Sequence, residues 1–108
     1  MDKSVVKSKV KEEISKIDSL NNFHGITKKN IESFLVEPFT VDVDPDDLET
    51  TKRKMWVVLQ ERKDVNEGYS IAYDPFSNDW AVIESAGKNL DFILVTSGET
   101  IAEALESM

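Results

Sequence analysis

The sequence predicts a single α+β domain, with a mainly antiparallel sheet of four to five strands packed by two N-terminal helices and one C-terminal helix. Three observations predict this class. Apolar residues recur at helical spacing near both ends of the chain, and short runs with strand-like alternation fill residues 39–95. A chain of 108 residues without cysteine or internal repeats can bury one core without a disulfide or thiolate metal site. Residues 1–108 are therefore expected to form one domain.

The first predicted helix covers residues 4–18. Val6, Val10, Ile14 and Ile17 follow one another at spacings of four, four and three, which places them on one face of an α-helix, and Ser4 precedes them as an N-cap. Lysine and glutamate dominate the opposite face. The apolar stripe is narrow and lacks aromatic residues, so we expect it to pack on the sheet rather than on a membrane. The alternative is that this helix pairs with its counterpart in a second copy.

A second, shorter helix is predicted over residues 27–36. Thr27 has the position of an N-cap, and Ile26 and Ile31 flank it with the spacing of a hydrophobic staple. Pro38 would end the helix, because proline cannot supply the backbone N–H that a helix requires.

Five strands are predicted to follow, with the central hairpin as the firmest element. Tyr69, Ile71 and Tyr73 alternate with small residues, and a turn cluster then leads to Trp80, so Tyr73 and Trp80 are expected to pair across the hairpin. The predicted strands cover residues 39–43, 55–60, 69–73, 80–84 and 91–95.

The chain is predicted to end in an amphipathic helix over residues 97–107. Thr96 and Glu99 have the spacing of a capping box, and Ile101, Leu105 and Met108 continue at intervals of four and three residues.

The net charge of −8 is distributed unevenly. Residues 1–30 carry about +3 and residues 31–108 about −11. A negative field repels phosphate backbones and favours basic partners, although it also keeps a small domain soluble. No nucleic-acid partner is therefore expected. Because residues 1–16 lack an apolar signal region and no apolar run approaches the length of a membrane span, we expect a cytoplasmic protein without membrane attachment.

The densest acidic cluster consists of Asp42, Asp44, Asp46, Asp47 and Glu49. Alternating carboxylates can bind calcium or magnesium, but the calcium-loop pattern requires glycine where Asp47 stands and glutamate where Arg53 stands. Asp44 before proline instead resembles the start of a short helical turn through residue 50. No metal site is predicted here.

No other group of residues forms a catalytic signature. Asp74 and Asp79 flank the predicted hairpin tip, where turn residues usually remain exposed with ordinary acidity. His24 is the only histidine, and no phosphate-binding, dinucleotide-binding, serine-hydrolase or histidine-pair zinc motif is present. We therefore predict no catalytic residue and no cofactor.

The aromatic residues gather on the central strands, and two roles are open to them. Their main expected role is in the core, and the alternative is an exposed patch that anchors a protein partner. They are Trp56, Tyr69, Tyr73, Phe76 and Trp80.

The segment from Gly68 to Glu84, GYSIAYDPFSNDWAVIE, resembles a strand-turn-strand pattern of small uncharacterised bacterial proteins. It is also similar to acidic immunity proteins that neutralise secreted or contact-delivered toxins. The resemblance rests on the Gly-Tyr start, the Asp-rich turn and the tryptophan. It would imply an intracellular, stoichiometric inhibitor and brings no catalytic residues.

Together these observations predict a non-enzymatic cytosolic module that binds a basic protein, such as an immunity-type inhibitor of a basic toxin. The alternative is an α+β protein that binds a small molecule or metal in a cleft between sheet and helices. The residues predicted to bind the partner are Asp42, Asp44, Asp46, Asp47, Glu49, Asp74, Phe76, Asp79 and Trp80.

Overall fold

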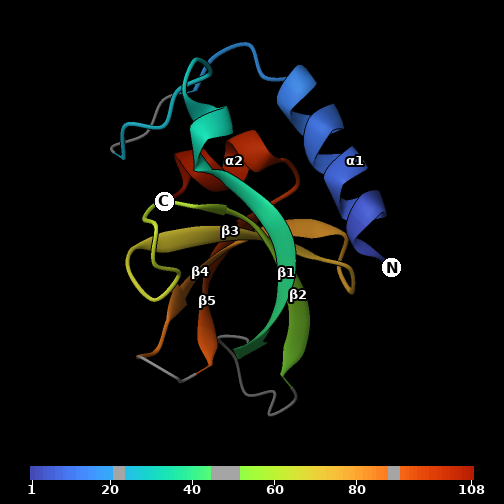
Figure 1. The fold of residues 1–108 in the computed structure, drawn as a ribbon, viewed down its shortest axis with the longest axis vertical. Coiled ribbons are helices and arrows are strands. Elements are labelled where there is room, and N and C mark those ends of the chain that lie inside the picture. The colour runs from blue at the N-terminus through green and yellow to red at the C-terminus, as the bar shows by residue number, and fades with distance from the viewer. Residues whose placement is uncertain (21–23, 45–51, 88–90) are drawn as a thin grey trace.

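A computed structural model describes residues 1–20, 24–44, 52–87 and 91–108 as one α+β domain (Figure 1). Two α-helices, one short 3-10 helix (η1) and five strands follow one another along the chain. Their order is α1 (Lys3–Ser15), η1 (Ile31–Phe34), β1 (Leu35–Asp44), β2 (Arg53–Gln60), β3 (Tyr69–Asp74), β4 (Asp79–Ser85), β5 (Phe92–Gly98) and α2 (Ile101–Glu106). Among the described residues, no helix is long and apolar enough to cross a membrane.

The five strands close into a barrel in chain order. Each strand runs antiparallel to the next, and β1 and β5 close the barrel as a parallel pair through Val43 with Phe92 and Asp44 with Ile93. The helices gather at one end of the barrel, and the other end is where β1 stops and β2 and β5 begin (Figure 1). The predicted antiparallel strands are thus confirmed. Their closure into a barrel was not predicted.

The predicted central hairpin is confirmed. Tyr73 on β3 pairs with Trp80 on β4, and their ring centroids lie 5.0 Å apart. Since neighbouring residues of a strand point to opposite faces, Ala72 and Ala81 pair on the other side.

Two apolar clusters occupy the two faces of this sheet. One draws buried residues from all five strands and fills the barrel, where the paired alanines leave room for larger side chains. The other lies between the sheet and the helices, where Val6 and Val10 of α1 and Leu105 of α2 cover Tyr73 and Trp80. The sheet-facing stripe predicted for the first helix is therefore confirmed.

The prediction of two N-terminal helices is wrong. Within residues 27–36 only η1 is helical, and a turn precedes it in which the Asn30 side-chain oxygen accepts the Thr27 N–H at 2.7 Å. Ile26 and Ile31 are buried as the staple pattern predicts. The chain then enters β1 at Leu35, so residues that continue the helical spacing become strand.

The predicted caps of the two α-helices are also corrected. Asp2 caps α1, because its Oδ1 accepts the Val5 N–H at 3.1 Å, and Ser4 donates its hydroxyl to the same oxygen. Thr100 caps α2, whereas Thr96 lies within β5.

Candidate functional site

The tip of the β3–β4 hairpin carries the most exposed large apolar side chain of the described residues. Phe76 is 80% exposed, and the guanidinium of Arg53 lies 4.7 Å from the centre of its ring. Phenylalanine and arginine are both enriched in protein interfaces relative to the rest of the surface. The tip therefore has the composition of an interface anchor.

Asp74 fixes the shape of this tip from beneath. Its carboxylate accepts the Phe76 N–H at 2.9 Å, the Ser77 hydroxyl at 3.0 Å and an Arg53 N–H at 3.3 Å. Its backbone carbonyl accepts the Asn78 N–H at 2.8 Å. Asn78 has a φ of 62°, a left-handed conformation that asparagine tolerates, and the Tyr73 hydroxyl donates to its side-chain oxygen. Phe76 is thus held on a turn that is ordered before any partner arrives.

The expectation that Asp74 is exposed is wrong. Its residue is 3% exposed, because all of its carboxylate bonds are made within the turn and to Arg53. Trp80, another predicted partner-binding residue, is also 3% exposed and packs on Tyr73. These two residues support the tip from inside and do not present a surface to a partner.

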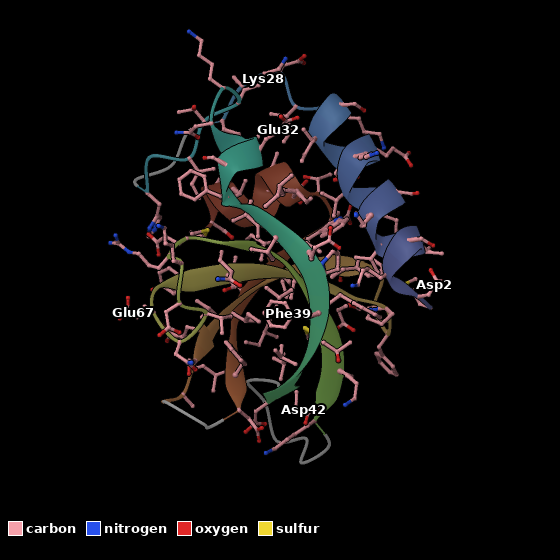
Figure 2. The ribbon with its side chains drawn as sticks, viewed as in Figure 1. Asp2, Lys28, Glu32, Phe39, Asp42 and Glu67 are labelled. Carbon is pink, nitrogen blue, oxygen red and sulfur yellow. The ribbon has the colours of Figure 1, made fainter. Side chains whose placement is uncertain are left out.

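The described part of the acidic cluster lies at the end of β1. Asp42 and Asp44 are exposed, and Figure 2 shows Asp42 at the end of the molecule opposite Lys28. Lys54 lies 3.4 Å from an Asp42 carboxylate oxygen, which offsets part of its charge. Asp46, Asp47 and Glu49 lie outside the described residues, as does the helical turn predicted to follow Asp44 through residue 50; Asp44 itself is the last residue of β1.

A second group of carboxylates flanks the hairpin tip, and Asp79 is the one member of it that was predicted from the sequence. Asp79 lines a hollow of about 410 Å³ together with Glu99 and Glu103, and none of the described residues that line it is basic. Glu99 also lines an adjoining hollow of about 150 Å³, which lies between α1 and the hairpin. We call this group the acidic ridge; it consists of Glu12, Glu13, Asp79, Glu99 and Glu103.

Two lysines reduce the charge of the acidic ridge without cancelling it. Lys16 lies 3.2 Å from Glu12 and 3.8 Å from Glu13, and Lys9 lies over the Tyr73 ring at 5.4 Å. The ridge as a group was missed because its members come from α1, from β4, from the residues between β5 and α2, and from α2, which are distant in sequence and meet only in the fold. No local spacing could have signalled it.

His24 and Glu61 form a part-buried side-chain hydrogen bond. His24 Nδ1 bonds Glu61 Oε2, and Glu61 Oε1 accepts the Tyr69 N–H at 3.0 Å. Burial alone would raise the pKa of Glu61, but the hydrogen bonds from Tyr69 and His24 outweigh it and lower that pKa below its ordinary 4.5. The arrangement ties the loop before η1 to the β2–β3 connection.

No described group of three or more histidine, aspartate or glutamate side chains is arranged to hold a metal ion. Comparison with known proteins adds no assignment: no protein-family model, curated protein or solved structure matches the chain.

Proposed function

We propose that this protein is a non-enzymatic binding module that holds a basic protein partner at the tip of the β3–β4 hairpin. The observation that carries the proposal is Phe76, which is exposed on a turn already ordered by Asp74. Binding costs less free energy when the contacting side chain does not have to be ordered first.

The charge around the tip supports a basic partner. The acidic ridge lies to one side of Phe76, and Asp42 and Asp44 lie beyond Arg53 at the end of β1. Charge complementarity of this kind mainly raises the association rate and excludes acidic competitors. An immunity-type inhibitor of a basic toxin, acting in the cytoplasm, is the form of this function that the small acidic fold suits best.

The proposal is tested by capturing partners from a lysate of the source organism at about 50 mM and about 500 mM salt, since the higher salt screens charges beyond a few ångströms. The immobilised wild type, Phe76→Ala and Phe39→Ala are compared by mass spectrometry, with the half-exposed Phe39 as the matched aromatic control. We expect a basic protein that the wild type and Phe39→Ala retain at low salt and that Phe76→Ala loses.

The purified partner then allows a kinetic test. Its association rate should fall at least about tenfold between low and high salt, and Glu99→Gln combined with Glu103→Gln should lower the low-salt rate. An association rate that does not depend on salt, or equal retention by Phe76→Ala, would contradict the proposal.

A second candidate function rests on the hollow between α1 and the hairpin. Tyr73, Trp80 and three glutamates line it together with Lys9, whose ammonium lies 5.4 Å from the centre of the Tyr73 ring. A small organic cation that took the place of the Lys9 ammonium would meet the same aromatic and acidic groups. Its volume of about 150 Å³ is below the roughly 300–1,000 Å³ of most ligand pockets, which places this function second. A thermal-shift series with small amines, Mg²⁺ and Ca²⁺ distinguishes the two functions, because only a ligand of the native state raises the Tm with concentration.

A further inference from the structure

The first half of β1 leaves the regular register of the sheet. Leu35 pairs with Leu59 and Phe39 with Val57, so three residues of β1 stand opposite the single residue Val58 of β2. One of the three is Pro38, which has no N–H to donate to a neighbouring strand. Such a bulge bends its strand and interrupts the ladder with the neighbouring strand.

Two hollows adjoin along this bulged segment and share Leu35 and Val36. One, of about 370 Å³, lies between α1 and β1, and its floor is formed by Val10, Pro38 and Val58 together with the shared pair. The other, of about 390 Å³, extends past Phe34 to the end of β2. Together they form one open groove with a largely apolar floor.

The groove has basic side chains at both ends, although the protein carries a net charge of −8. Lys7 and Lys11 border the first hollow, and Arg62 and Lys63 border the second. Within the described part of the chain, the side-chain nitrogens of Lys11, Arg62 and Lys63 make no hydrogen bond or ion pair.

The acidic side chains of the groove are already engaged. Glu37 bonds Lys7 at 2.9 Å and lies 3.8 Å from Lys3, while Glu61 bonds His24 and the Tyr69 N–H. The charge that remains for a ligand is therefore positive.

From this groove we infer a second binding site, which takes an acidic, apolar peptide segment of a partner protein. Apolar side chains of the segment would lie on Leu35, Val36 and Val58, and its carboxylates would meet Lys11 at one end and Arg62 and Lys63 at the other. A fatty acid suits the groove less well, because it has one carboxylate for two basic ends and needs a more enclosed cavity than these open hollows provide.

The test uses a fluorescein-labelled octapeptide of alternating glutamate and leucine, titrated with the full-length protein at low salt and followed by anisotropy. Two further octapeptides, one of alternating lysine and leucine and one of alternating glutamate and serine, separate the charge from the apolar contribution. We expect saturable binding of the Glu-Leu peptide and at least about tenfold weaker binding of the other two.

The double variant Lys11→Glu, Arg62→Glu should bind the Glu-Leu peptide about tenfold more weakly than the wild type does. Lys28→Glu is the matched control, since Lys28 is an exposed lysine that lines neither hollow. A shift-perturbation experiment with ¹⁵N-labelled protein gives a second readout and should move the amides of Lys11, Val36 and Lys63.

Three results would overturn the inference. They are equal binding of all three peptides, shifts confined to the hairpin tip, and tighter binding of decanoate than of the Glu-Leu peptide in the same groove. Because Phe76 takes no part in this site, Phe76→Ala should bind the peptide as the wild type does, so the outcome is independent of the function proposed above.

Discussion

At the scale of single residues, two part-buried or buried carboxylates, those of Asp74 and Glu61, hold turns and loops in place through hydrogen bonds. Asp74 was expected at an exposed turn, yet its carboxylate is enclosed and bonds Phe76, Ser77 and Arg53. Turn statistics could predict that an aspartate stands there, because its side chain bonds the backbone two residues on. They could not predict Arg53 as its partner, because Arg53 is 21 residues away and arrives through the pairing of β2 with β3.

Glu61 provides a prediction for the dependence of stability on pH. Its folded-state pKa is lowered, so it stabilises the fold above its unfolded value of 4.5, and this contribution is lost as the pH falls through the folded value. We expect the free energy of unfolding to fall less between pH 6 and pH 3 in Glu61→Gln than in the wild type.

Urea unfolding across that pH range measures the difference, with Glu32→Gln as a control at an exposed glutamate. If the free energy of unfolding depends on pH in the same way in the wild type and in Glu61→Gln, the pKa of Glu61 is not lowered in the folded protein.

At the scale of elements, the sequence was sufficient where a signal is local and repeated. The Tyr73–Trp80 hairpin follows from period-two alternation around a turn cluster, and the stripe of α1 from helical spacing. The prediction placed the start of the last helix too early. Thr96 and Glu99 have the spacing of a capping box, but Thr96 pairs with Val82 in the sheet. Thr96 and Thr100 are both plausible N-caps by sequence, and the pairing of Thr96 with β4 leaves Thr100 as the cap.

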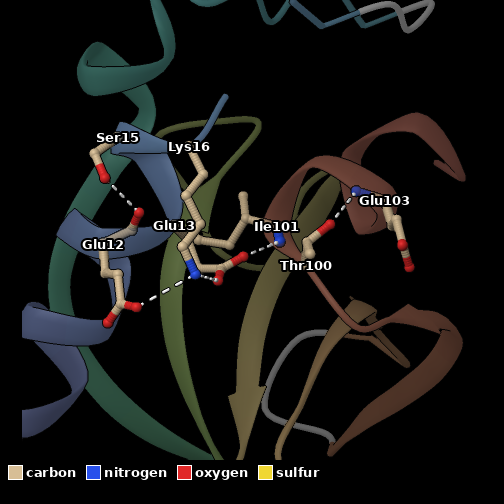
Figure 3. A network of polar contacts seen from close by, with 7 residues as sticks. All are labelled: Glu12, Glu13, Ser15, Lys16, Thr100, Ile101 and Glu103. Atoms are coloured by element: carbon tan, nitrogen blue, oxygen red, sulfur yellow. Dashed lines mark hydrogen bonds and ion pairs between the residues drawn. The ribbon is translucent and has the colours of Figure 1, made fainter. Parts of the chain in front are cut away.

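The true start of α2 depends on α1 as well as on its own cap. Thr100 Oγ1 accepts the Glu103 N–H at 3.0 Å, and Glu13 of α1 accepts the Ile101 N–H at 3.1 Å (Figure 3). Helix N-termini carry backbone N–H groups with no partner within the helix, so an acceptor from another helix stabilises both the terminus and the contact.

We therefore expect Thr100→Ala and Glu13→Ala each to lower the free energy of unfolding by about 1 kcal/mol. Glu12→Ala is the matched control, because Glu12 is one residue away on α1 and its exposed carboxylate is drawn in contact with Lys16 and not with α2 (Figure 3). The Ser15 hydroxyl bonds the backbone carbonyl of Glu12, which the substitution keeps. Urea unfolding of the three variants checks this. If Glu12→Ala and Glu13→Ala lower the free energy of unfolding equally, the loss in Glu13→Ala comes from helix propensity and not from the bond that caps α2.

At the scale of the whole molecule, the sequence predicted strands but not their closure. A sheet closes into a barrel when its first and last strands pair with each other. Among the residues that the structure describes, β1 and β5 pair through Val43 with Phe92 and Asp44 with Ile93. The two residues of each pair are 49 positions apart in the sequence, and the local sequence around them does not predict that they pair. The acidic ridge and the bulged groove arise in the same way, from segments that closure and helix docking bring together.

The short seam predicts an uneven protection of backbone amides. Among the described residues, the β3–β4 ladder extends over six residue pairs and the β1–β5 seam over two, so the seam should open locally at a lower free energy. We expect seam amides to exchange with deuterium roughly 10 to 100 times faster than those of Ile71 and Val82, as measured by NMR hydrogen exchange. Equal protection of both would show that the barrel opens only by global unfolding.

The parallel seam has a further consequence, which follows from parity. When an odd number of strands alternate in direction around a ring, two neighbours must point the same way, and in this protein they are β1 and β5. A single additional strand inserted elsewhere in the ring would run parallel to one of its neighbours. At the β1–β5 seam alone it would run antiparallel to both. Strand exchange or strand donation therefore has its most favourable geometry at the seam, where the described strands share the fewest residue pairs.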